Sequence, residues 1–135
     1  MLGVHPYITF PGNCRQAIDY YRSALGAEVL FLQTVGGSPM PEMGPADNIM
    51  HCSIKVGEST IMMSDDLAPG GGSAPGNISL AIGLNDPARA RQLFANLAES
   101  GTVLMSLDKT YWAEAFGIVI DRFGVKWMIN CDAPN

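Results

Sequence analysis

The amino-acid sequence predicts an α+β protein made of two βαβββ modules. Residues 4–64 and residues 77–130 each read, in order, as a strand, a capped helix, a glycine, a strand, a loop and a hairpin. This repeated order indicates an internal duplication. Residues 65–76, rich in Gly and Pro, read as the linker between the modules. We therefore expect one domain over residues 1–135, in which the modules form a curled, half-barrel-like mixed sheet with the helices on its outer face.

The first module begins with a strand and a helix. Residues 4–10 contain β-branched and aromatic residues and end at Pro-Gly-Asn, so a strand leads into a helix with Asn13 as its N-cap and Gly26 after its last turn. The apolar positions at helical spacing are Cys14, Ala17, Ile18, Tyr21 and Leu25. The elements that follow are a strand over residues 27–35, a long irregular loop over 36–48 and a hairpin over 49–64.

The second module repeats this order. Residues 78–84 read as a strand, and Asp86 with Pro87 forms an N-cap followed by a first helical residue. The apolar stripe of this helix is Ala90, Leu93, Phe94, Leu97 and Ala98. The last elements are a strand over residues 102–107, a loop over 108–114 and a closing hairpin over 118–130. Asp121 stands at the turn of that hairpin, which favours a turn-capping role over a catalytic one.

Charge and cysteine content exclude several classes of partner. The net charge is −5 with eight Lys and Arg residues, so we expect neither nucleic acid nor an anionic membrane as a partner. No leader pattern or apolar run of about eighteen residues is present, and we expect a cytoplasmic protein. Cys14, Cys52 and Cys131 are odd in number, widely spaced and without a CxxC pair, so we interpret them as small buried residues.

Five stretches resemble the PhnB-like group of the vicinal oxygen chelate superfamily, which includes glyoxalase I, extradiol dioxygenases and bleomycin and fosfomycin resistance proteins. The stretches are PGNCRQAIDYYRSALGAE, IMHCSIKVG, IMMSDD, YWAEAFG and DRFGVKWMIN. The resemblance implies a cup between the sheets, with metal ligands, usually His and Glu, on the first and last strands of each module. Alignment of the helix caps places these ligand positions at Pro6, Met62, Ser79 and Met128. Since these are poor ligands for a hard divalent ion, we expect neither a metal nor a cofactor.

Strand alternation predicts which side chains line the cup. The predicted ligand-binding residues are Ile8, Phe10, His51, Ser53, Met62, Ser64, Ser79, Ala81, Trp112, Phe116 and Met128. Small and flexible apolar side chains would leave room for a compound, although the same residues could simply fill a core. His51 is the candidate for general acid or base, or for a hydrogen-bond anchor to a carbonyl or phenol. The alternative is a structural histidine.

Three functions stay open at this point. The first is a metal-free homodimer that binds a small apolar or aromatic compound in the cup. The second is an enzyme, either a lyase, isomerase or hydrolase that uses His51, or a metal-dependent dioxygenase or glyoxalase with other ligands than those aligned above. The third is a dimer that only interacts and binds no ligand. The resemblance and the apolar loop residues Met40 and Met43 favour dimerisation. A methyltransferase is disfavoured, because the chain has no Gly-rich strand-to-helix turn for a nucleoside cofactor.

Overall fold

The computed structural model describes residues 3–66 and 78–134, and it divides into two compact units, Met1–Ala74 and Pro75–Asn135. The elements of the first unit are β1 (Tyr7–Phe10), α1 (Cys14–Leu25), β2 (Glu28–Thr34), a short 3-10 turn (Pro41–Met43), β3 (Ile49–Val56) and β4 (Ser59–Asp65). Those of the second unit are β5 (Leu80–Leu84), α2 (Pro87–Ala98), β6 (Thr102–Asp108), β7 (Ala115–Ile120) and β8 (Lys126–Cys131). The predicted α+β class with two βαβββ modules is confirmed.

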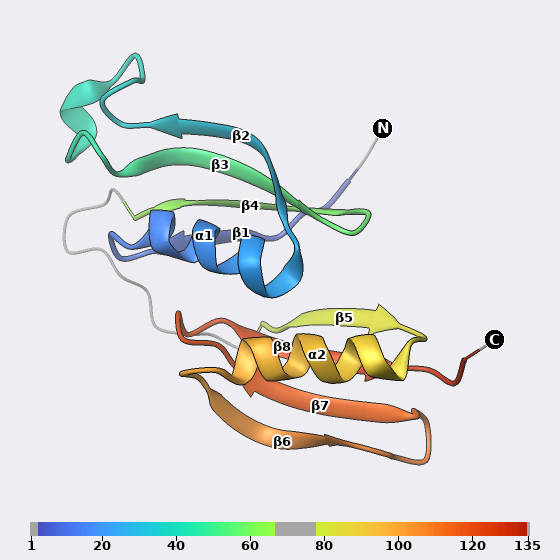
Figure 1. Ribbon diagram of the computed structural model, residues 1–135. Coiled ribbons are helices and arrows are strands. Elements are labelled where there is room, and N and C mark those ends of the chain that lie inside the picture. The colour runs from blue at the N-terminus through green and yellow to red at the C-terminus, as the bar shows by residue number, and fades with distance from the viewer. Residues whose placement is uncertain (1–2, 67–77, 135) are drawn as a thin grey trace. The chain divides into compact units, whose positions relative to one another are not determined.

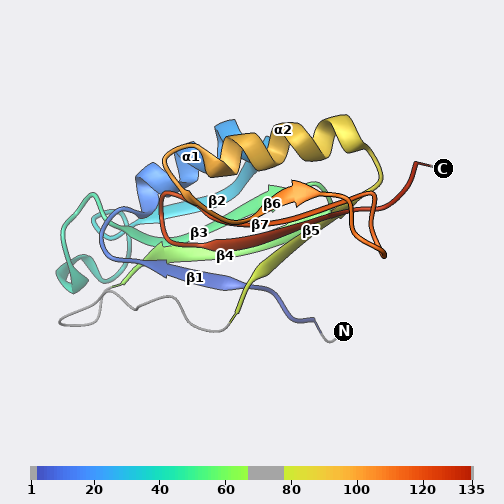
Figure 2. The same cartoon turned by 90° about the horizontal axis from the view of Figure 1, so that it is seen from below.

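Each unit forms its own four-stranded mixed sheet. The strand order is β1-β4-β3-β2 in the first unit and β5-β8-β7-β6 in the second. The first strand pairs in parallel with the last, and the other neighbours are antiparallel. In both units the helix lies on one face of its own sheet (Figures 1 and 2) and contacts the last three strands of that unit. We call the opposite sheet face the open face of that unit.

The helices form where the apolar spacing predicts them. The buried residues of α1 are Cys14, Ala17, Ile18, Tyr21, Ala24 and Leu25, and those of α2 are Ala90, Leu93 and Leu97. Gly26 ends α1 in the left-handed conformation with φ 68°, which glycine adopts without steric cost. Asp86 caps α2, since its Oδ1 accepts hydrogen bonds from the backbone N of Ala88 at 3.1 Å and of Arg89 at 3.2 Å.

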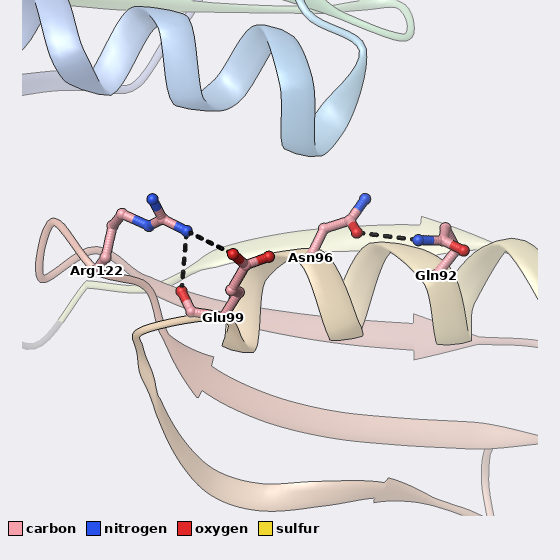
Figure 3. A network of polar contacts seen from close by, with 4 residues as sticks. All are labelled: Gln92, Asn96, Glu99 and Arg122. Atoms are coloured by element: carbon pink, nitrogen blue, oxygen red, sulfur yellow. Dashed lines mark hydrogen bonds and ion pairs between the residues drawn. The ribbon is translucent and has the colours of Figure 1, made fainter.

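Polar contacts on the outside of α2 are solvent-exposed (Figure 3). Gln92 Nε2 donates to Asn96 Oδ1 at 2.9 Å, one helical turn further on. Arg122 in the turn between β7 and β8 donates to the backbone oxygen of Glu99 at 3.4 Å, and its Nη2 lies 3.6 Å from Glu99 Oε1. Exposed ion pairs of this kind contribute at most about 1 kcal/mol, so they position the end of α2 more than they stabilise the unit.

The start of α1 differs from the prediction. Asn13 occupies the N-cap position, but its side chain makes no capping hydrogen bond, and its buried Oδ1 has no partner among the described residues. The carboxylate of Asp65, which is only 2% exposed, caps the start of α1 instead. Its Oδ1 accepts from Cys14 N at 2.9 Å and its Oδ2 from Ile49 N at 2.7 Å. Asp65 is therefore the last residue of β4, and its assignment to the linker is wrong.

The predicted turn role of Asp121 is confirmed. Its Oδ1 accepts from the backbone N of Phe123 at 2.8 Å and of Val125 at 3.1 Å, and its Oδ2 accepts from Trp127 Nε1 at 2.8 Å. Gly124 completes the turn at φ 86°. The second unit thus uses its buried carboxylate to hold a hairpin, where the first unit uses Asp65 to join a helix to two strands.

The loop between the first strand and the helix is one residue longer in the first unit than in the second. Three residues follow Phe10 before α1 begins, whereas two follow Leu84 before α2. Phe10 and Leu84 occupy corresponding positions, because each accepts a backbone hydrogen bond from the residue that follows the last strand of its unit. The backbone N of Asp66 donates to the Phe10 oxygen at 2.6 Å, and that of Asp132 donates to the Leu84 oxygen at 2.9 Å. Gly12, at φ 95°, accommodates the extra residue. Alignment by helix caps therefore misplaces β1 by one residue.

The remaining predictions have mixed outcomes. The loop over residues 36–48 contains the short turn Pro41–Met43, so the prediction of a wholly irregular loop is wrong. Residues 67–76 of the predicted linker lie outside the described residues. No helix within residues 3–66 and 78–134 is long and apolar enough to cross a membrane. The curl of the sheet and the cytoplasmic location stay predictions.

Candidate functional site

One row of side chains crosses all four strands of the first unit. Ser53 of β3 pairs with Met62 of β4 on one side and with Phe31 of β2 on the other, and Met62 pairs with Tyr7 of β1. Paired residues share a sheet face. The neighbouring positions Cys52, Ile54 and Met63 are fully buried on the helix side, so the row lies on the open face.

His51 lies beside this row and contacts three of its members. Tyr7 Oη is 3.5 Å from His51 Nδ1, and Ser53 Oγ is 3.4 Å from His51 Nε2. The imidazole also lies close to two aromatic rings, with centroid distances of 5.8 Å to Tyr7 and 5.9 Å to Phe31. We call Tyr7, Phe31, His51 and Ser53 the His51 cluster.

The His51 cluster is accessible and chemically versatile. Tyr7 is 49% exposed and Phe31 50% exposed, so both rings present apolar surface to solvent. A hydroxyl group can donate or accept, and the cluster therefore satisfies His51 in its neutral and in its protonated form. A histidine with a hydroxyl at each ring nitrogen can bind a polar group or move a proton.

The sequence prediction missed Tyr7 and Phe31 and placed two other residues on the wrong face. Ile8 pairs with Met63, and Phe10 with Asp65, whose side chains are buried on the helix side. The prediction that Ile8 and Phe10 face the cup is therefore wrong, because Gly12 lengthens the loop that follows β1. An alignment of the two units by the parallel pairing of β1 with β4, instead of by the helix caps, would have placed Tyr7 on the open face.

The open face of the second unit carries its own aromatic residues. Trp112 Nε1 donates to Asn130 Oδ1 at 3.1 Å. The Trp112 ring meets Tyr111 edge-on at 4.8 Å and Phe116 at 5.2 Å between centroids. Tyr111 is almost fully exposed and Trp112 about half exposed. We call Tyr111, Trp112 and Phe116 the aromatic cluster of the second unit.

The other predicted site residues lie around these two clusters. Met128 pairs with Ala81, and Asn130 pairs with both Gly83 and Phe116, so these side chains share the open face of the second unit. Ser79 lies just before β5. In the first unit Ser64 pairs with Thr9, on the same face as the row, but it is buried.

The residues do not fit the metal that the family implies. The strand pairs match Phe10 with Leu84, so the position that corresponds to Ser79 is His5, two residues before β1, and not Pro6. The corrected set of ligand positions is His5, Met62, Ser79 and Met128. One imidazole, one hydroxyl and two thioethers, without a carboxylate, make a poor site for a hard divalent ion. Across residues 3–66 and 78–134, no group of three His, Cys, Asp or Glu side chains could hold a metal ion.

The three cysteines lie in the cores and are poorly suited to nucleophilic chemistry. All three are free and buried. Burial raises the pKa of the Cys52 thiol to about 11. Burial, and then the charge of Asp65, raises the pKa of Cys14 well above its usual range. A reactive cysteine needs a thiolate, which both environments disfavour.

Fold and sequence together define the class of protein. The sequence model of the Glyoxalase/Bleomycin resistance protein/Dioxygenase superfamily matches residues 3–129, and the chain belongs to this family. The paired βαβββ units are those that the vicinal oxygen chelate resemblance implies. Within the family, a solved structure described as a PhnB protein shares the fold, and the resemblance to the PhnB-like group stays a prediction.

Particular relatives make the comparison more precise. The chain is 37% identical over 136 residues to the protein YjdN of Escherichia coli strain K12, covering 93% of this chain and 92% of that protein. The solved structure of protein PA1353 from Pseudomonas aeruginosa is 38% identical, with a TM-score of 0.87 over 98% of this chain and 99% of that one. A PhnB protein from Bacillus cereus shares the fold, with a TM-score of 0.82 at 19% identity over 96% and 99% of the two chains.

Proposed function

We propose that this superfamily member binds a small apolar or aromatic compound on the open faces of its sheets, without a bound metal ion. The observation that carries the proposal is the His51 cluster, in which two half-exposed aromatic rings flank one imidazole. Small-molecule sites commonly combine an apolar wall with a few polar groups that fix orientation. Tyr7 and Phe31 supply the wall, and His51 with Ser53 supplies the polar groups.

The second unit supports the same proposal with a different surface. Its aromatic cluster offers an exposed indole ring held by the hydrogen bond from Trp112 to Asn130. Aromatic side chains bury a large area against a planar ligand at little cost in conformational freedom. Met128 and the small Ala81 flank this surface and adapt to different shapes.

The test is binding of nitrobenzene, an aromatic probe without an acidic hydrogen, measured by titration calorimetry. We expect Tyr7→Ala and Phe31→Ala each to weaken binding about tenfold, since loss of one stacking ring costs about 1–3 kcal/mol. Val103→Ala removes an exposed apolar side chain of β6 and serves as the matched control, with unchanged affinity expected. Absence of nitrobenzene binding by the wild-type protein would contradict the proposal.

The metal-free part of the proposal has its own measurement. The four positions in the corrected ligand set contain only one good ligand for a divalent ion, so stoichiometric Mn²⁺, Zn²⁺ or Ni²⁺ should leave the melting temperature unchanged. A metal that binds the folded state tightly would raise it. Such a rise, abolished in His5→Ala, would show that this strand does supply a metal ligand.

We also propose that the protein forms a homodimer through exposed apolar edges. β2 and β6 each lie at one edge of their sheet, and both have a register shift at the same place, at Leu30 and at Leu104. Both leucines are exposed, as are Met40 and Met43. Exposed apolar edge strands promote association unless they are covered. Size-exclusion chromatography with light scattering should give twice the chain mass, and Leu30→Lys with Leu104→Lys should shift it toward the monomer.

An enzyme that uses His51 as acid or base is the second candidate. The hydroxyls of Tyr7 and Ser53 at its two ring nitrogens favour this role, because one nitrogen can accept a proton while the other keeps its hydrogen bond to a hydroxyl. His51→Gln should then abolish turnover of a bound compound while binding persists. Unchanged turnover would leave the histidine without a catalytic role.

A further inference from the structure

We propose that the His51 cluster selects compounds with an acidic hydroxyl on a planar ring or enol, and that it takes up the proton of that hydroxyl. This inference rests on the proposed function and names the class of ligand for the same site. It assigns separate tasks to Tyr7 and Ser53, which bind the two nitrogens of His51 from opposite sides.

We take His51 in the tautomer whose ring proton is on Nε2, and this choice sets the direction of the relay. With the ring proton of neutral His51 on Nε2, this nitrogen donates to Ser53 Oγ at 3.4 Å, and Nδ1 accepts from Tyr7 Oη at 3.5 Å. Tyr7 then keeps its oxygen lone pairs free for a second hydrogen bond. Since Tyr7 is about half exposed, a ligand hydroxyl can donate to that oxygen.

The proton transfer balances within the cluster and the ligand. The O–H bond of the ligand breaks and its proton passes to Tyr7 Oη, while the original phenolic proton of Tyr7 moves to Nδ1 of His51. The ligand becomes a phenolate or enolate, and His51 becomes an imidazolium whose Nε2 still donates to Ser53. Neither an oxidant nor a metal ion takes part in this step.

The strand of His51 and the neighbouring strand β2 carry one positive and one negative charge near the cluster. Gln33, which is neutral, pairs with His51 across the strands. Lys55 lies on the same face two residues beyond Ser53, and Glu28 pairs with it. The negative charge of Glu28 is thus offset by Lys55, and the newly formed imidazolium is the cation next to the bound anion.

The rings explain why the ligand should be planar. Tyr7 and Phe31 lie on opposite outer strands of the sheet and both approach His51 with tilted rings, at interplanar angles of 36° and 45°. A flat compound placed over the row contacts both rings while its hydroxyl reaches Tyr7. A compound without the hydroxyl keeps the ring contacts and loses the hydrogen bond.

The test compares 4-nitrophenol with nitrobenzene, which differ by the hydroxyl. We expect wild-type protein to bind 4-nitrophenol about tenfold more tightly, the usual effect of one hydrogen bond to a charged or polarised group. At a pH where free 4-nitrophenol is mostly un-ionised, binding should also produce the visible absorption band of nitrophenolate. Tyr7→Phe and His51→Gln should remove both effects, whereas Val103→Ala, outside the cluster, should keep both. Phe31→Leu should weaken both probes equally.

The outcomes separate this inference from the proposed function. Equal affinity for the two probes, or tighter 4-nitrophenol binding that persists in Tyr7→Phe and His51→Gln, would overturn the inference and leave the aromatic site in place. Failure of both probes to bind would overturn both. Circular dichroism and melting temperatures of the variants, compared with those of Val103→Ala, verify that the first unit is folded in each case.

Discussion

The two units share one fold and differ in how they hold it. Both have the same strand order and the same edge-strand irregularity. The first unit holds the start of its helix with Asp65 from the far end of the unit, whereas the second uses Asp86, the residue directly before the helix. The residue that corresponds to Asp65 in the second unit is Cys131. A duplicated fold can therefore satisfy the same backbone groups by different means.

The open faces differ in chemistry as well. The first unit brings an imidazole and two hydroxyls among its aromatic rings. The second unit brings an indole and an amide, Trp112 and Asn130, which can bind a ligand but are poor acids and bases. By this comparison the proton transfer that we propose would take place in the first unit, whereas the proposed apolar binding involves both units.

The largest expected effect comes from Asp65→Ala. This change leaves the N–H groups of Cys14 and Ile49 buried without their acceptor, at a cost of about 1–3 kcal/mol each. We expect a loss of about 4 kcal/mol in the free energy of unfolding, measured by urea denaturation. A loss below about 1 kcal/mol would mean that other groups replace the carboxylate.

Much of the fold was readable from the sequence, because it depends on local patterns. Helical spacing from Cys14 to Leu25, and turn chemistry at Asp121, are properties of neighbouring residues. The role of Asp65 and the facing of Tyr7 depend on pairing between the first and last strands, which no local pattern encodes. Alternation alone predicted which residues of β3 lie on the open face. The same prediction for β1 also required the length of the loop around Gly12, because one extra residue reverses the face on which each side chain of β1 lies.

The next effect concerns pH and the core of the first unit. The folded protein raises the pKa of Cys52 from 9.0 to about 11, so the folded state keeps a proton that the unfolded state loses between these values. The stabilising contribution is complete below pH 9 and is lost as the pH rises toward 11. We expect a decline of about 1–2 kcal/mol over this range, and a smaller decline in Cys52→Ala.

A smaller effect is expected from Asp86→Ala in the second unit. This residue is a conventional N-cap, so its loss should cost about 1 kcal/mol in the free energy of unfolding. Asp86→Ser keeps a side-chain acceptor and is the control, with most of the stability retained. An effect as large as that of Asp65→Ala would contradict the distinction between the two caps.

The smallest effect is expected from Asn13→Ala. An ordinary N-cap asparagine is worth about 1 kcal/mol, but the Asn13 side chain makes no capping bond and its buried oxygen has no partner among the described residues. We expect a change below about 0.5 kcal/mol by the same denaturation measurement. A full loss of about 1 kcal/mol would show that Asn13 caps the helix in solution.

The position of Asp65 also sets an order of events during synthesis. Cys14 and Asp65 are 51 residues apart in the chain, so α1 leaves the ribosome long before the acceptor for its first backbone N–H exists. The second helix emerges with Asp86 already in place. Completion of the first half must therefore wait for its last strand, and a nascent chain stopped before that strand should expose a helix with a frayed beginning.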